Sequence, residues 1–326
     1  VWGASGVGTA TGFFNPSKFV LGSFDTTNTG LTTFSSAINL NGVTRTIVVP
    51  MGLSSGGNVS KISGVISSSG TAGLIKEGGG TLILDAANTY LGDTTISGGT
   101  LRIGNNTSGS LNGGDYSGNI SIASDATLQI WSTTAHTLSG VISGEGGLDK
   151  AYGGALTLSG PNTYNGLTSI SAGKLFINGT LSNTAAALNV GTGATLGGTG
   201  TISGAVNVTG VLSPGASIES LGTGTLTLNN GSSFKYEMNT ATTGGDLLYV
   251  SGDLNIGANV TLDLTDLAAL SQALTVDTKF TLFSYTGTWN GGTFSGYADD
   301  STFLFATNEW RINYNDLIGG SNFTSD

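Results

Sequence analysis

The sequence LIKEGGGTLILDAANTYLGDTTISGGTLRI at residues 74–103 returns as LDKAYGGALTLSGPNTYNGLTSISAGKLFI at residues 148–177, and 16 of the 30 aligned positions are identical. Both copies consist of short runs in which apolar and small polar residues alternate, and Gly, Asn, Asp or Ser ends each run. Alternation with a period of two indicates strands that bury one face, and the residues that end the runs favour turns. The repeat therefore predicts three short strands joined by tight turns.

One copy of this repeat is too small to bury its own aliphatic face. Copies stacked one above another would bury a continuous aliphatic column, as repeat proteins do. We therefore predict an all-β chain that folds as a right-handed parallel β-helix, or solenoid, with atypical, aromatic-rich terminal segments. The predicted core residues, five from each copy, are Leu82, Leu84, Ile96, Leu101, Ile103, Leu156, Leu158, Ile170, Leu175 and Ile177.

The two ends of the chain lack the repeat and are richer in aromatic residues. We predict a non-repeat segment at 1–35 that acts as a donor strand or a cap, solenoid repeats at 36–265, and a C-terminal cap or contact region at 266–326. Helix-like spacing of apolar residues occurs at 264–274, where a loop beside two strands is the alternative. The residues predicted to contact a neighbouring copy are Val1, Trp2, Phe13, Phe14, Phe19, Trp289, Trp310 and Phe323.

The composition excludes several classes of function. The chain has 10 Lys and Arg against 20 Asp and Glu, for a net charge of −10, and its basic residues are scattered singly. Nucleic acid and anionic membranes need clustered basic residues, so neither is an expected partner. The absence of cysteine excludes disulfides and thiolate metal sites. No apolar run reaches the ~18 residues of a membrane span.

The chain begins at Val1 without a basic and apolar leader. We therefore expect a mature form, located outside the cell after export, whose signal has been removed.

Residues that could support catalysis are few. His136 is the single histidine, so a Ser-His-Asp triad would have to use it, and a turn or surface position is the expectation for it. The acids stand isolated among Gly, Ser and Thr, and we predict that the chain is not an enzyme and holds no cofactor. A polysaccharide-active enzyme on a β-helix is an alternative. Calcium is the ion that the acids at 243–246 and 299–300 would suit, although neither segment matches a known calcium loop.

The repeat resembles the autotransporter-associated β-strand repeat, which occurs in passenger domains of bacterial autotransporters and in other large exported surface proteins. Both copies share Asn-Thr-Tyr-x-Gly, at Asn88 and Asn162, and the stretch GATLGGTGTI at 193–202 is similar to a further passenger sequence. The resemblance covers roughly residues 35–265. It implies a β-solenoid, export across the bacterial envelope and a place at the cell surface.

Two functions compete on these observations. The first is a structural subunit of a bacterial surface fibre or layer, because a solenoid has open ends that identical copies could pair head to tail. The second is an adhesin or passenger domain that binds glycans or surfaces through exposed loops and aromatic residues, among them Trp289, Tyr297 and Trp310. Burial of these aromatics in a terminal cap is the alternative for their role.

Overall fold

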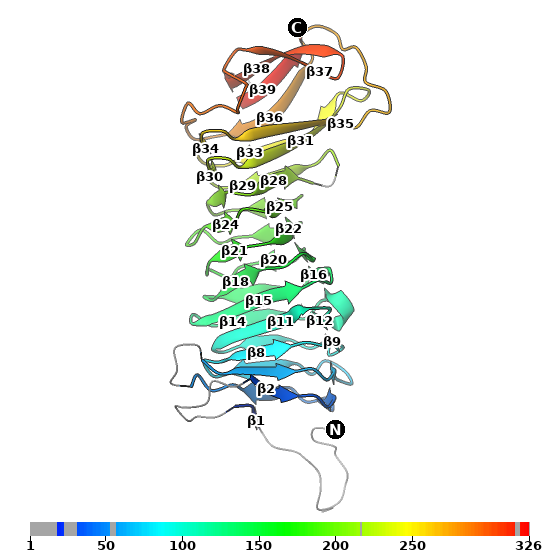
Figure 1. The fold of residues 1–326 in the computed structure, drawn as a ribbon, viewed down its shortest axis with the longest axis vertical. Helices are drawn as coiled ribbons and strands as arrows, with labels where there is room; N and C mark the ends of the chain where they lie inside the picture. The colour runs from blue at the N-terminus through cyan, green and yellow to red at the C-terminus, as the bar shows by residue number, and fades with distance from the viewer. Residues whose placement is uncertain (1–17, 23–30, 53–56, 216, 317–319, 326) are drawn as a thin grey trace, which may run out of the picture. The chain divides into compact units, whose positions relative to one another are not determined.

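The computed structural model describes residues 18–22, 31–52, 57–215, 217–316 and 320–325, with no side chains described at 316 and 320–325. Over these residues the chain consists of β-strands and contains no α-helix; a single 3-10 turn, η1, spans Asn112–Gly114 (Figure 1). None of the helical structure in this described part is long and apolar enough to cross a membrane. The strands stack mostly in parallel, so the prediction of a parallel β-helix is confirmed.

The chain divides into two compact units, residues 1–168 (unit 1) and 169–326 (unit 2). The boundary lies inside the second copy of the repeat and inside the predicted solenoid segment 36–265. Both units consist of rungs, each of which supplies one short strand to each of several sheets.

The described residues of unit 1 form two long parallel sheets, a sheet of three strands and two strand pairs. The first sheet orders as β1 (Lys18–Val20), β4 (Arg45–Val48), β7 (Leu74–Glu77), β10 (Thr94–Ile96), β14 (Ile120–Ile122) and β17 (Ile142–Gly144). The second orders as β2 (Leu31–Phe34), β5 (Val59–Ile62), β8 (Thr81–Leu84), β11 (Gly99–Thr107), β15 (Ala126–Ser132) and β18 (Gly147–Lys150). The remaining strands are β13 (Asp115–Tyr116), β16 (His136–Leu138) and β19 (Ala155–Leu158), the pairs β3 (Ile38–Asn39) with β6 (Ile66–Ser67) and β9 (Ala87–Asn88) with β12 (Ser110–Leu111), and β20 (Pro161–Asn162).

In the part of unit 2 that the structure describes, the strands form three sheets. The first orders as β21 (Thr168–Ile170), β24 (Leu188–Val190), β27 (Val206–Val208), β30 (Leu226–Leu228) and β34 (Leu254–Ile256). The second orders as β22 (Gly173–Ile177), β25 (Ala194–Gly198), β28 (Val211–Pro214), β31 (Ser233–Asn239) and β32 (Gly244–Gly245), with β35 (Thr261–Asp266) beside β31. The third orders as β23 (Thr180–Leu181), β26 (Thr201–Ile202), β29 (Ser220–Thr223), β33 (Leu247–Val250), β36 (Lys279–Tyr285), β39 (Gly320–Ser325), β38 (Asn308–Asp316) and β37 (Thr302–Phe305).

Aligned aliphatic ladders form the core. In unit 1 Leu82, Leu101, Leu128 and Leu148 face one another directly across four successive strands, β8, β11, β15 and β18. Figure 1 shows β8, β11 and β15 one above another. All ten residues that the repeat marked for the core are 1% or less exposed. Parallel pairing in register thus places the same side-chain position of each rung on the same interior line.

The repeat's shared polar residues join one rung to the next. Asn88 accepts the N–H of Ile66 and donates to the carbonyl oxygens of Ala86 and Ser110, at 2.9 to 3.0 Å. Asn162, its counterpart, accepts the N–H of Ile142 at 3.0 Å and donates to Gly160 at 2.9 Å. Both amides are fully buried. The Asn of the motif therefore satisfies backbone groups at a corner, which is a structural role.

The lysine that both copies share points into the core. Lys76 lies between Ile47 and Ile96 of the neighbouring strands and is 0% exposed. Its ammonium donates to three carbonyl oxygens, those of Gly78, Gly80 and Gly98. Burial lowers the pKa of Lys76 to about 8. The cation is tolerated because it donates to carbonyl oxygens of two turns, Gly78 and Gly80 after β7 and Gly98 after β10.

Unit 2 changes character near its end. After β33 and β36, which are parallel, the sheet continues through β39, β38 and β37 in antiparallel pairing. Phe234, Phe283 and Phe294 stack on one another in this region, with centroids 4.7 to 6.0 Å apart. The segment 264–274 holds no helix, because β35 runs to Asp266 and irregular backbone follows it. The loop alternative for this segment is the one observed.

Candidate binding surface

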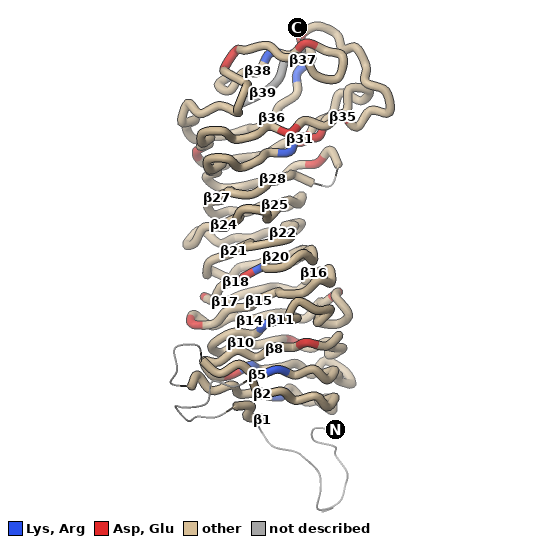
Figure 2. The backbone as a smooth tube through the Cα atoms, in the orientation of Figure 1, with Lys and Arg blue, Asp and Glu red and all other residues tan. Residues whose placement is uncertain are grey.

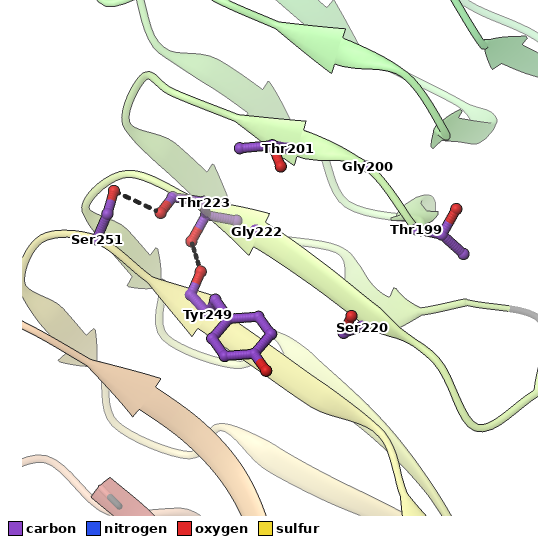
Figure 3. A pocket seen from close by; sticks show the side chains of 8 residues that line it. All are labelled: Thr199, Gly200, Thr201, Ser220, Gly222, Thr223, Tyr249 and Ser251. Atoms are coloured by element: carbon purple, nitrogen blue, oxygen red, sulfur yellow. Dashed lines mark hydrogen bonds between the residues drawn. The ribbon is translucent and has the colours of Figure 1, made fainter.

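A hollow of about 340 Å³ opens on the third sheet of unit 2, across β26, β29 and β33 (Figure 3). Small residues and one aromatic ring line it. These residues are Thr199, Gly200, Thr201, Ser220, Gly222, Thr223, Tyr249 and Ser251. The hollow is shallow and open to solvent, so a ligand bound there would lie against the sheet.

Strand register explains why the surface is hollowed. Thr201, Gly222 and Tyr249 face one another across the three strands. Gly222 supplies no side chain to this column, and a Cβ there would lie 3.3 Å from the Thr201 side chain. The Tyr249 ring stands out from β33 and is 51% exposed. The missing side chain at Gly222 therefore leaves a gap beside the exposed Tyr249 ring on the outer face of the sheet.

The floor beside the ring is held rigid by hydrogen bonds. The Ser251 hydroxyl donates to the carbonyl of Thr223 at 3.1 Å, and the Thr223 hydroxyl donates to that of Tyr249 at 3.5 Å (Figure 3). Residues 175–218 contain no charged side chain, and Figure 2 shows β24, β25 and β27 free of charge. Hydroxyl groups and an aromatic face suit an uncharged ligand rich in hydroxyl groups.

The predicted contact aromatics take different positions. Phe19 on β1 packs edge-on against Phe34, with centroids 5.0 Å apart. Trp289 is half-buried, stacks on Tyr314 at 5.5 Å and donates its indole N–H to Gly292. Trp310 is fully buried and donates its indole N–H to Phe305 at 2.9 Å, so its ring lies inside its own chain.

The remaining predicted contact residues have no described side chains. Val1, Trp2, Phe13 and Phe14 lie outside the described residues, and Phe323 belongs to β39, where side chains are not described.

His136 lies on β16 and is 2% exposed, so the prediction of a turn or surface position is wrong. Its Nδ1 lies 2.9 Å from the carbonyl oxygen of Thr134. Burial lowers its pKa, which favours the neutral ring. Its position in the strand follows the inward alternation of Leu138, two residues later.

The acids considered for calcium brace backbone turns. Asp246 is buried and accepts the N–H groups of Glu219 and Glu237 at 3.1 and 3.0 Å. Burial, followed by the neighbouring carboxylates, raises the pKa of Asp246 to about 7. Asp299 accepts the N–H of Tyr314 at 3.0 Å, and Asp300 accepts the Asn313 amide at 2.9 Å. Among the described residues, no group of three or more His, Cys, Asp or Glu could hold a metal ion.

Tyr249 escaped the sequence reasoning, which looked for functional aromatics near the chain ends. The sequence signal for it is the run Leu247-Leu-Tyr-Val, in which apolar residues do not alternate with polar ones. A large aromatic residue thus occupies an outward strand position. Thr or Ser usually fills such positions in this chain.

Comparison with known proteins agrees with this architecture. Residues 74–103 and 148–175 match the family described as the passenger-associated transport repeat. The chain is also similar to the adhesin BmaC autotransporter of Brucella suis biovar 1 (strain 1330), with 33% identity over 199 aligned residues. That alignment covers 52% of this chain and 6% of the relative, so the chain spans only a small part of that protein's length.

Proposed function

We propose that this chain, which belongs with the repeat-built autotransporter passengers exported to the bacterial cell surface, is the β-helical part of an adhesin that binds saccharides on other surfaces. The similar protein from Brucella carries the name adhesin, and its similarity to half of this chain supports the proposal. The residues that the repeats share stabilise the stacking of the rungs. Ligand recognition therefore depends on the outward residues, which differ from rung to rung.

The hollow beside Tyr249 is the observation that carries the proposal. A sugar ring has one face of C–H groups and a rim of hydroxyls, and it needs an aromatic surface next to hydrogen-bonding groups. Tyr249 offers the ring, and Thr199, Thr201 and Ser220 offer hydroxyls around the hollow. The parallel sheet holds these groups at fixed spacing, which reduces the entropy lost on binding.

Head-to-tail assembly into a fibre has less support. The rings of Phe280, Phe283, Phe294 and Trp310 are buried within unit 2, so these four aromatics are not available to pair with another copy. The antiparallel strands β39, β38 and β37 also extend a sheet that a fibre would need to leave open. We therefore place binding ahead of polymerisation.

A glycan microarray probed with the whole purified chain tests the proposal. We expect binding to a subset of neutral glycans, with a loss of about tenfold in Tyr249→Ala, the size of an aromatic anchor's contribution. Gly222→Val should have the same effect, because it fills the hollow and leaves the ring in place. Leu304→Ala removes a side chain that is 83% exposed elsewhere in unit 2 and should bind as the parent does.

Two results would contradict the proposal. One is the absence of binding to any glycan on the array. The other is the formation of long filaments in negative-stain images of the same preparation, with equal glycan signals from the parent and Tyr249→Ala.

A further inference from the structure

A row of polar side chains crosses the outward face of unit 1. Arg102 on β11, Gln129 on β15 and Asp149 on β18 lie directly opposite one another in the parallel register. The Arg102 Nε donates to the Gln129 side-chain oxygen at 2.9 Å, and the Gln129 amide donates to Asp149 at 3.1 Å. Each of the three side chains is half-buried, so the row is held in place but remains accessible.

Two aromatic rings border this row. The Arg102 guanidinium carbon lies 3.8 Å from the centre of the Trp131 ring, a cation–π contact that fixes the indole. The Trp131 ring in turn packs against Tyr152, with centroids 5.6 Å apart. Tyr152 is 37% exposed. Planar polar groups and an accessible aromatic ring thus meet at one place.

Tyr152 occupies a backbone position that suits glycine. Its φ is +66°, and its counterpart in the first copy of the repeat is Gly78, with φ +81°. A residue with a side chain is strained in this left-handed region. The turn is fixed by the buried Lys150 ammonium, which donates to the Tyr152 carbonyl at 2.6 Å, as Lys76 does to Gly78. The second copy therefore accepts strain where the first copy has none.

A second position of this cluster also differs between the copies. Asp149 stands where the first copy has Ile75. The two exchanges, Ile to Asp on strand β18 and Gly to Tyr in the turn that follows it, lie three residues apart and face the same outward cluster. Stacking of rungs explains neither of them, because the first copy pairs its strands equally well without them.

We propose that Arg102, Trp131, Tyr152, Gln129 and Asp149 form a saccharide-binding site in unit 1 that takes a neutral oligosaccharide. The inference rests on the proposed function and adds a second site to it. Arg102 and Asp149 carry opposite charges, so the site has no net charge and does not favour an anionic sugar. The guanidinium donates to sugar hydroxyl oxygens, Asp149 accepts from a neighbouring hydroxyl, and the C–H face of the sugar lies on Tyr152.

The test uses the whole chain with Tyr249→Ala, which silences the hollow of unit 2. Saturation-transfer NMR is recorded with two neutral disaccharides, lactose and N,N′-diacetylchitobiose, and with an anionic heparin disaccharide. We expect a signal with at least one neutral probe and none with heparin. Tyr152→Gly in this background should weaken binding about tenfold, whereas Tyr152→Phe should retain it.

Stability separates a binding role of Tyr152 from a structural one. Relief of the positive φ offsets the lost ring contact, so Tyr152→Gly should unfold within about 2 °C of its parent. A clear loss of stability with unchanged saccharide binding would overturn the second site. If the single variant Tyr249→Ala gives no saturation-transfer signal although the parent chain does, the second site is also overturned. That result would instead support binding at the hollow of unit 2. Binding confined to heparin would overturn the neutral class of ligand.

Discussion

Replacement of Leu101 by Ala is the most direct probe of the stacked core. Leu101 is 0% exposed and lies between Leu82 and Leu128 on the neighbouring strands. Those two rungs are fixed by their own backbone pairing, so the surroundings cannot collapse into the space that the smaller side chain leaves.

The expected cost follows from the buried volume. Removal of the Leu side-chain carbons loses about 2 kcal/mol of transfer free energy. The unfilled cavity raises the total loss in the free energy of unfolding to about 3–4 kcal/mol. For a unit of this size, the unfolding temperature should fall by about 10 °C.

The assay is thermal unfolding of the whole chain, followed by circular dichroism and by Trp fluorescence. Thr100→Ala is the matched control, because Thr100 is the preceding residue of β11 and lies in the outward column opposite Thr81 and Thr127. Its effect should stay below about 0.5 kcal/mol. Equal shifts in the two variants would refute the assignment of inward and outward faces.

Two further predictions concern buried polar groups. Asn88→Ala removes three hydrogen bonds from a buried amide to backbone groups and should cost about 2–3 kcal/mol in thermal unfolding, whereas Asn119→Ala, which removes an exposed bond to Val141, should cost under about 1 kcal/mol; similar costs would contradict the role of the buried amide. Because the pKa of Asp246 is raised to about 7, the folded chain keeps a proton that the unfolded chain releases near pH 4. Calorimetry should therefore show stability that falls as the pH rises from about 4 to 7, with Asp246→Asn removing that dependence, and a rise over this range in the parent would count against it.

The core of the fold was predictable from the sequence because its signal is local and repeated. Leu82, Leu101 and their counterparts follow a period of two, and the second copy at 148–177 repeats the pattern. The interior lysines were not predicted, since an isolated Lys in an alternating strand suggests an outward position. Lys76 is buried because the turn that follows its strand and the turn before β11 supply carbonyl acceptors, which alternation does not reveal.

The binding surfaces depend on register between rungs, which the sequence leaves open. Thr201, Gly222 and Tyr249 align across three strands. Their spacings in the sequence, 21 and 27 residues, differ because loops of different length separate the strands. Arg102, Gln129 and Asp149 are likewise 27 and 20 residues apart. Because the number of residues per rung varies, their spacing in the sequence does not predict that these residues share one face. The backbone strain at Tyr152 is likewise not visible in the sequence, because it follows from the positive φ that Tyr152 shares with Gly78.

The decisive experiment for saccharide-dependent binding measures how beads coated with the chain attach to glycan-bearing cells. We expect that the beads attach, that enzymatic removal of cell-surface glycans releases them, and that the double variant Tyr249→Ala, Tyr152→Gly attaches several-fold less while it remains folded. Equal attachment of the parent and the folded double variant, or attachment that glycan removal leaves unchanged, would contradict saccharide-dependent binding.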